Sequence, residues 1–180
     1  VLELINDNSY RKTANGVEEL TGGIMSHTAV HNLVQELGNK KAAMDKERRK
    51  ELFEYGKIPE GDKKEVDQLF IEVDGVNIYL KEEDRERAEL KLGLSYEGWE
   101  ERYRGSNEYK TKNKELYGGV FDKEVFWEEM GSKIYQNKMF KGAPVVLNGD
   151  RDAWIYERKE YIPEIDVREL DSYNWNKKIV

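Results

Sequence analysis

Several residue types that commonly build functional sites are missing or scarce in this chain of 180 residues. There is no cysteine, which excludes disulfides and thiolate metal sites. The only two histidines, His27 and His31, lie one helical turn apart, but no third ligand accompanies them, so no zinc site is predicted. No apolar run approaches the roughly 18 residues that a membrane span needs, and no targeting segment is found. These absences predict a soluble, cytoplasmic protein.

The chain also has fewer basic than acidic residues. Thirty Lys and Arg stand against 37 Asp and Glu, a net charge of -7, which is the wrong sign for a protein that coats nucleic acid nonspecifically. The distribution is uneven, however, because six basic residues gather between positions 40 and 50: Lys40, Lys41, Lys46, Arg48, Arg49 and Lys50. Any contact with DNA is expected there, and the alternative is an ordinary solvated helix face.

The chain has enough apolar and aromatic residues to fold. Hydrophobic residues make up 38% of it, with eleven Tyr, five Phe and four Trp. Its length suits one compact domain with a small appendage. The breaker Ile58–Asp62 follows a charged helical stretch and predicts a linker, which divides the chain into residues 1–61 and 62–180.

Residues 1–61 are predicted to be helical. Apolar residues recur at i, i+3, i+4 and i+7 twice, in Tyr10, Thr13, Ala14 and Val17, and in Val30, Leu33, Val34 and Leu37. Ser9 and Ser26 are suitable N-caps, Thr21–Gly23 breaks the chain, and Gly38 is expected to end the second helix. This outline predicts a helix-turn-helix, with Ser26, His27, Thr28 and Asn32 facing the DNA groove. Helical hairpins of this kind also occur in proteins that do not bind DNA.

Beyond residue 62 the period changes to that of strands. Residues 69–73 and 76–80 alternate around Asp74-Gly75, which predicts a hairpin, and residues 90–96 predict a third strand. A charged turn is expected at 81–87, a loop at 104–114, and a helix capped by Asp122. Residues 144–148 are typical of a strand buried on both faces, and a helix and a last strand at 165–170 follow. The fold class is therefore α/β, with a mixed sheet in which the fourth strand lies parallel to the first.

Two aspartates stand where such a sheet collects catalytic groups. Asp74 is expected at the carboxyl end of the first strand and Asp150 at that of the fourth, so the two carboxylates converge if these strands are neighbours. Such a pair suits a divalent metal site for phosphodiester cleavage. Each aspartate is also an ordinary residue at a turn or helix cap. Asp152 competes with Asp150, and Glu72 with Asp74, for the same role.

Short motifs along the chain resemble those of Lre-type insertion-sequence transposases. In the first part these are Ser9–Lys12, Leu20–Gly22, Ser26–His31 and Val34–Gly38. In the second part these are Phe70–Val76, Lys91–Gly93, Tyr96–Gly98, the helix with Phe126-Trp127, Leu147–Asp150 and Trp154-Ile155. The motifs are weak singly, but they follow one another in the family's order over nearly the whole chain.

The resemblance implies a transposase of the DDE class, whose RNase H-like core uses two Asp and a later Glu to bind Mg²⁺ or Mn²⁺. Asp74 would be the first carboxylate and Asp150 the second. The third lies, in the family, beyond the segment that corresponds to Leu170–Tyr173, so we expect it after Val180. Arg151 and Asn174 replace a Gly and a His that are frequent in the family.

These features predict an amino-terminal helix-turn-helix followed by a partial RNase H-like mixed sheet, in a bacterial cytoplasmic protein. The partner is the DNA at the ends of the insertion sequence, and a homo-oligomer is compatible with it. We expect little or no strand transfer by this chain alone. The alternative is a DNA-binding remnant or repressor that recognises element ends without catalysis, and a globular relic without activity is a third hypothesis.

Overall fold

The computed structural model describes residues 1–79, 87–150 and 152–170. Arg151 and Asn174, the departures noted above, lie outside these ranges, as does most of the predicted turn at 81–87. The chain divides into two compact units, Val1–Arg48 and Arg49–Val180. The boundary near residue 62 stays a prediction. Within the described ranges, no helix combines the length and apolarity that crossing a membrane requires.

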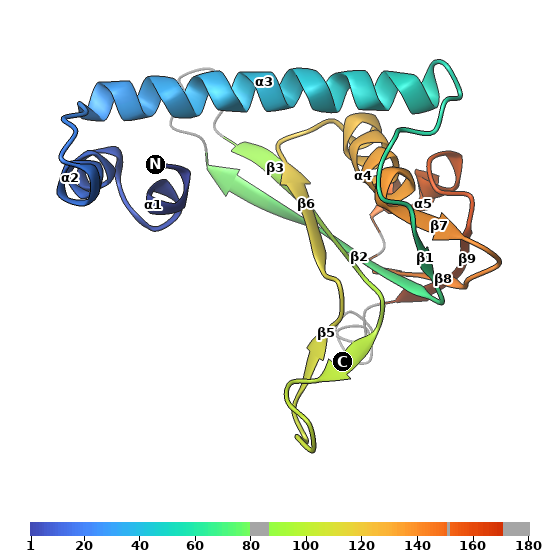
Figure 1. Ribbon diagram of the computed structural model, residues 1–180. Helices are drawn as coiled ribbons and strands as arrows, with labels where there is room; N and C mark the ends of the chain where they lie inside the picture. The colour runs from blue at the N-terminus through green and yellow to red at the C-terminus, as the bar shows by residue number, and fades with distance from the viewer. Residues whose placement is uncertain (80–86, 151, 171–180) are drawn as a thin grey trace, which may run out of the picture. The chain divides into compact units, whose positions relative to one another are not determined.

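The first unit is helical and holds α1 (Leu2–Asp7), α2 (Tyr10–Thr21) and most of α3 (His27–Phe53) (Figure 1). Ser9 caps α2, since its Oγ accepts from the Lys12 N–H at 3.4 Å. Gly22 ends α2 with a φ of 68°, a left-handed conformation that glycine adopts without strain. The Ser26 Oγ accepts from the Ala29 N–H at 3.1 Å at the start of α3. The predicted caps and break are therefore confirmed.

The prediction that Gly38 ends the second helix is wrong. α3 has 27 residues and runs through Gly38 to Phe53. The residues that follow are mostly Lys, Ala, Glu and Arg, which favour a helix strongly. Their summed preference outweighs the cost of about 1 kcal/mol for one glycine inside a helix.

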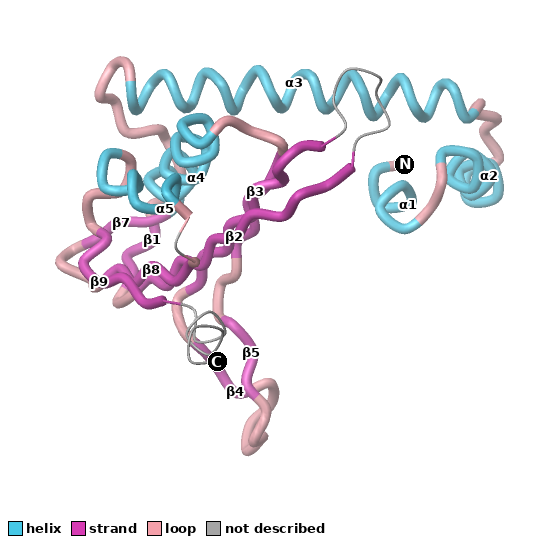
Figure 2. The backbone as a smooth tube through the Cα atoms, turned by 180° about the vertical axis from the view of Figure 1, so that it is seen from behind, coloured by secondary structure: helices cyan, strands magenta, loops and turns pink. Residues whose placement is uncertain are grey.

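The second unit is built around a five-stranded mixed sheet with the order β6-β3-β2-β8-β9 (Figure 2). Its strands are β2 (Leu69–Tyr79), β3 (Arg87–Tyr96), β6 (Glu115–Gly119), β8 (Val145–Gly149) and β9 (Ile165–Leu170). β3 is antiparallel to β2 and β6, whereas β8 is parallel to β2 and β9. The mixed α/β class is thus confirmed, as is the parallel pairing of the first strand with the strand that carries residues 145–148.

The smaller elements complete this unit. β1 (Lys64–Val66) pairs with β7 (Lys138–Phe140), and β4 (Trp99–Glu101) pairs with β5 (Tyr109–Thr111). The helices are α4 (Lys123–Asn137), the short α5 (Ala153–Tyr156) and the 3-10 turn η1 (Glu157–Glu160). Asp122 occupies the N-cap position of α4 as predicted, although its side chain makes no capping hydrogen bond.

The hairpin predicted at Asp74-Gly75 is wrong, because β2 runs straight through these two residues. It pairs with β3 from Phe70 opposite Tyr96 to Tyr79 opposite Arg87. Burial alternates regularly from Leu69 to Gly75, and the strand then continues with mostly exposed residues to Tyr79.

The third antiparallel strand is β6, within a region for which no strand was predicted. Its sequence, ELYGG, is short and contains two glycines, so it carries no alternation. β8 also differs from the prediction of a strand buried on both faces. Its residues alternate between buried and half-buried, because helices cover only one face of the sheet.

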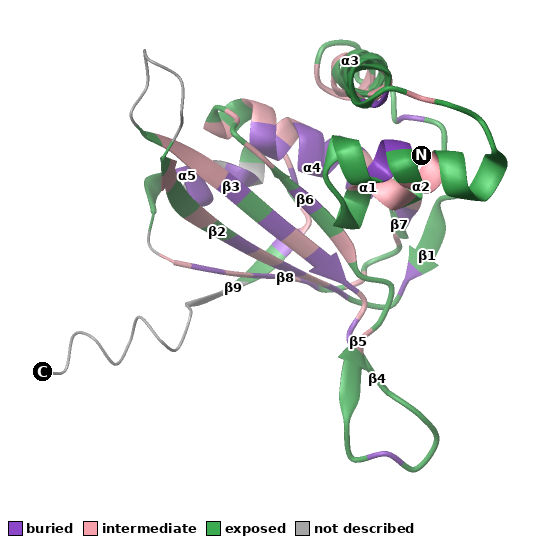
Figure 3. Ribbon diagram, turned by 90° about the vertical axis from the view of Figure 1, so that its left-hand side faces the viewer, coloured by how far each residue is buried: buried purple, intermediate pink, exposed green. Residues whose placement is uncertain are grey.

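The core lies between the sheet and α4 and α5, as the buried residues in Figure 3 indicate. The sheet contributes Leu69, Ile71, Val73, Tyr117, Val145, Leu147 and Ile165. The helices and the chain after η1 contribute Phe126, Trp127, Met130, Ile134, Trp154, Ile155 and Ile162. The Trp127 indole donates to the Trp154 carbonyl at 2.8 Å, which joins α4 to α5. The opposite face of the sheet is more open, and Leu116 there is 72% exposed.

A buried network of charges joins the ends of β3 and β6. The Lys138 side chain, only 3% exposed, lies 3.0 Å from both the Glu97 and the Glu115 carboxylates. The other oxygen of Glu97 accepts from Asn113 at 2.6 Å and lies 3.1 Å from the Lys64 ammonium. Burial alone would raise the pKa of the Glu97 carboxyl, but the hydrogen bonds from Asn113, Lys138 and Lys64 outweigh it and hold the pKa below its usual value.

The one-sided core predicts unequal effects for two leucines of the same sheet. Leu147→Ala empties a site that is 0% exposed and should lower the free energy of unfolding by about 2–5 kcal/mol. Leu116→Ala, on the open face, should lower it by less than about 0.5 kcal/mol. Urea denaturation followed by tryptophan fluorescence measures both values, and equal losses would contradict the packing described.

The lowered pKa of Glu97 predicts an acid-sensitive component of stability. This component is present above the unfolded-state pKa of about 4.3 and is lost as the pH falls through the lower folded-state pKa. Glu97→Gln should lower the free energy of unfolding at pH 7 by about 1.5–3 kcal/mol. Below about pH 4, the free energy of unfolding of this variant should fall less steeply than that of the unmodified chain. Urea denaturation between pH 7 and pH 3 tests this. Glu100→Gln, at a more exposed ion pair, is the control and should behave like the unmodified chain.

Candidate functional site

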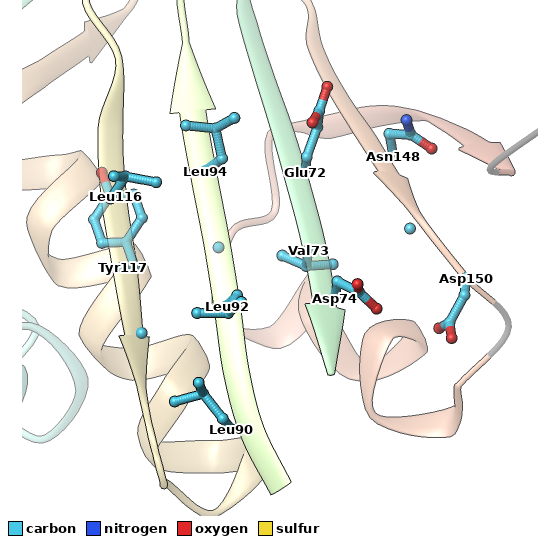
Figure 4. A pocket seen from close by; sticks show the side chains of 13 residues that line it. Glu72, Val73, Asp74, Leu90, Leu92, Leu94, Leu116, Tyr117, Asn148 and Asp150 are labelled. Carbon is cyan, nitrogen blue, oxygen red and sulfur yellow. The ribbon is translucent and has the colours of Figure 1, made fainter. Parts of the chain in front are cut away.

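A groove of about 650 Å³ runs along the open face of the sheet (Figure 4). β2 and β8 supply polar side chains along one part of it, namely Glu72, Asp74, Asn148 and Asp150. β3 and β6 supply most of the rest, which is mainly apolar: Leu90, Leu92, Leu94, Leu116 and Tyr117. The groove therefore combines an acidic side with an apolar side.

The register of β2 and β8 brings the two predicted carboxylates into one groove. Glu72 lies opposite Asn148, and Val73 lies opposite Gly149. Asp74 and Asp150 come next on each strand, and both line the groove (Figure 4). Because β2 and β8 are parallel neighbours, the arrangement on which the sequence prediction depended is present.

Glu72 and Asp74 share a face but differ in their partners. The Glu72 Oε1 accepts from the Tyr96 hydroxyl at 2.7 Å, so this carboxylate is tied to the neighbouring strand. The Asp74 Oδ1 accepts only from the adjacent Gly75 N–H, at 2.8 Å, among the hydrogen bonds of the described residues. Asp74 also lies inside β2, so it is not a turn residue. Of these two carboxylates, Asp74 is the better placed for a ligand.

Asp150 and Asp152 meet at the start of α5. The Asp150 Oδ1 accepts from the Asp152 N–H at 3.0 Å, so Asp150 also shapes the turn that leads into this helix. Burial raises the pKa of the Asp152 carboxyl, and the negative charges of Asp150, Glu89 and Asp74 raise it further. This end of the groove therefore has a negative potential that favours a bound cation.

The donor set fits a hard divalent cation. Magnesium is commonly held by one or two carboxylates and completes its coordination with water and substrate phosphate. Asp74 and Asp150 supply two carboxylates. The amide of Asn148, two residues before Asp150, lines the same groove. In the described ranges, no three His, Cys, Asp or Glu side chains form a ready metal cage.

Asn148 is a groove residue that the sequence prediction missed. Its Oδ1 is buried and has no hydrogen-bond partner among the described residues. It lies two residues before Asp150, so the period of two along β8 would have placed it on the same face. The leucines of β3 were predicted as strand residues but not as part of a site.

The residues predicted to contact DNA lie on α3. Ser26, just before it, and His27, Thr28 and Asn32 at its start are exposed. Ser26 also serves as the cap described above.

Most of the basic residues predicted for the same role have acidic partners. Lys40 lies 2.6 Å from Glu36, and Lys41 and Arg48 lie 3.4 Å and 2.8 Å from Asp45. Arg49 lies within the second unit, where its guanidinium donates to Glu129 of α4 at 2.9 Å. The side chains of Arg48 and Arg49 are only 13% and 17% exposed, so both are engaged within the protein.

The crowding of carboxylates predicts a measurable change in one pKa. Asp150→Asn removes the largest neighbouring charge that acts on Asp152 and should lower the pKa of Asp152. Carbon-13 NMR titration of the side-chain carboxyls measures this value. Asp67→Asn, at an exposed position ahead of β2, is the control and should leave it unchanged. An unchanged pKa in Asp150→Asn would mean that the two carboxylates are farther apart than described.

Comparison with curated proteins found no match. The profile of an uncharacterised protein family, UPF0236, matches residues 1–180, the whole of the sequence. On this match, the chain with the acidic groove belongs to the uncharacterised protein family UPF0236.

Proposed function

We propose that this chain is part of a DNA transposase of the DDE class, in which Asp74 and Asp150 hold a divalent metal ion. The observation that carries the proposal is their position after matching register positions of two parallel neighbouring strands, in one groove. The motifs that resemble Lre-type insertion-sequence transposases contain both aspartates and support the same assignment.

The sheet topology is a second support. Three strands follow one another in antiparallel pairs, β2, β3 and β6, and the next two, β8 and β9, run parallel to β2. This order is the one expected for an RNase H-like core, in which the first and fourth strands carry the first two carboxylates. We therefore propose an RNase H-like fold for the second unit.

The proposed chemistry is cleavage of a phosphodiester bond and transfer of the DNA strand. Mg²⁺ or Mn²⁺ bound by Asp74 and Asp150 would supply Lewis acidity to the reacting phosphate. No nucleophilic side chain is required, which agrees with the absence of cysteine from the chain. The hydroxyl of Tyr96 holds the Glu72 carboxylate, so Glu72 is not assigned this role.

For DNA recognition we propose that α2 and α3 act as a helix-turn-helix. Gly22 and the Ser26 cap set the turn, and His27, Thr28 and Asn32 are exposed beyond it. Lys40 and Lys41 would contact phosphates, since their side chains are 67% and 68% exposed despite their ion pairs. We leave Arg49 out of this set because of its contact with Glu129. The same features support a second candidate, a DNA-binding repressor without catalysis.

Metal binding tests the proposal. Isothermal titration with Mn²⁺ should detect binding that Asp74→Asn and Asp150→Asn each weaken at least tenfold or so, as expected for removed metal ligands. Glu72→Gln and Asp152→Asn are the matched controls and should bind Mn²⁺ more nearly like the unmodified chain. If Asp152→Asn has the larger effect, the assignment of Asp150 is wrong. Binding of element-end DNA without any binding of Mn²⁺ would favour the repressor.

A further inference from the structure

The connection between β3 and β6 is a hairpin that extends away from the five-stranded sheet (Figures 1 and 3). We call residues 97–114 the arm. Its strands β4 and β5 pair Trp99 with Thr111 and Glu101 with Tyr109, and further backbone bonds join residue 97 to 112 and 102 to 108. The hairpin is therefore regular almost to its tip, and it is more than a loose loop.

One face of the arm carries exposed aromatic rings. Residues opposite each other on paired strands share a face, so Trp99 and Tyr109 lie on the same side of the hairpin. Trp99 is 56% exposed and Tyr109 is 63% exposed, and Tyr103 at the tip is 65% exposed. Flat rings that are held by a hairpin and left open to solvent are suited to stacking with another planar group.

The aromatic face continues into the groove. The Trp99 ring lies 4.9 Å from that of Phe70 and 5.3 Å from that of Tyr96, and Tyr96 donates its hydroxyl to Glu72 in the groove. Phe70 and Tyr96 stack on each other at 5.3 Å. A row of rings thus leads from the acidic side of the groove onto the arm.

The charges of the arm favour an anionic partner. Each of its four acidic residues is engaged within the protein: Glu97 with Lys138, Glu100 with Lys110, Glu101 with the Gly105 N–H, and Glu108 with Arg102. Among the described residues, Arg104, Lys112 and Lys114 have no acidic partner. The arm therefore carries unpaired positive charge at its tip, where Arg104 follows Tyr103, and near its base, at Lys112 and Lys114, in a chain with a net charge of -7.

We propose that the arm binds single-stranded DNA that leaves the groove, with bases stacked on Trp99, Tyr109 and Tyr103 and phosphates near the three basic residues. Exposed aromatic rings and nearby cations are the two components that sequence-tolerant binding of single strands requires. Duplex DNA fits less well, because its bases are already stacked. The choice of DNA as the polymer rests on the proposed function, whereas the stacking site rests on the arm alone.

Fluorescence anisotropy with a labelled 20-nucleotide oligo(dT) and the full chain tests this site. Tyr103→Ala and Tyr109→Ala should each weaken binding at least fivefold or so, and Tyr109→Phe should restore it because the ring is kept. Tyr55→Ala, which removes a ring 67% exposed outside the arm, is the matched control and should bind normally. Equal binding by all these variants, or no binding by the unmodified chain, would overturn the proposal.

Photocrosslinking locates the contact independently of affinity. An oligonucleotide with 5-bromodeoxyuridine should crosslink to tryptic peptides from the arm, and crosslinks confined to other segments would contradict the assignment. If Mn²⁺ binding fails but the arm crosslinks, the proposed function fails and the arm remains. If Mn²⁺ binds at Asp74 and Asp150 but the arm variants bind normally, only the arm proposal fails.

Discussion

The parallel pairing of β2 with β8 is the contact on which both the core and the groove depend. Its register puts Ile71 beside Leu147 on the helix-covered face and Glu72 beside Asn148 on the open face. A slip of one residue would exchange the faces of one strand and bury carboxylates where leucine now packs. Glycine at position 149 allows the two strands and α5 to pack closely, since a Cβ there would lie 3.1–3.3 Å from Val73 and Ile155. The hydrophobic effect that fills the core therefore also sets where Asp74 and Asp150 lie.

The one-sided distribution of helices explains the character of the site. α4 and α5 remove one face of the sheet from water, and the other face carries leucines beside a row of oxygen-bearing side chains. The candidate site therefore lies on the face of the sheet that α4 and α5 leave uncovered. The acidic row lies in this groove, whereas the arm is a separate hairpin that follows β3.

Local patterns in the sequence predicted much of the fold. Caps at Ser9 and Ser26 and the break at Gly22 depend on residues within one turn of the helix, so the sequence displays them directly. The wrong prediction at Gly38 has a local cause, the strong helix preference of the residues that follow it, but two other failures have non-local causes. Asp74-Gly75 has the composition of a turn, but pairing with all of β3 keeps it extended, and β6 is a strand only because β3 offers it an edge.

The candidate site likewise has features that the sequence predicts and features that depend on distant residues. Asp74 and Asp150 could be predicted because a sheet with parallel strands collects residues at one edge. The partner of Arg49 lies 80 residues away along the chain, and the partners of Lys138 lie 41 and 23 residues away. No local sequence pattern therefore predicts these contacts. That Glu72 is engaged within the protein, unlike Asp74, also depends on the Tyr96 hydroxyl of another strand.

Lys138 contacts the residue at which the arm begins, Glu97, and one immediately after it ends, Glu115. The two ends are thus tied together by a side chain that belongs to neither of them. The length and sequence of the intervening hairpin place little demand on the sheet, because closing a longer loop costs only slightly more entropy. The arm can therefore change in length or sequence while the sheet keeps its register.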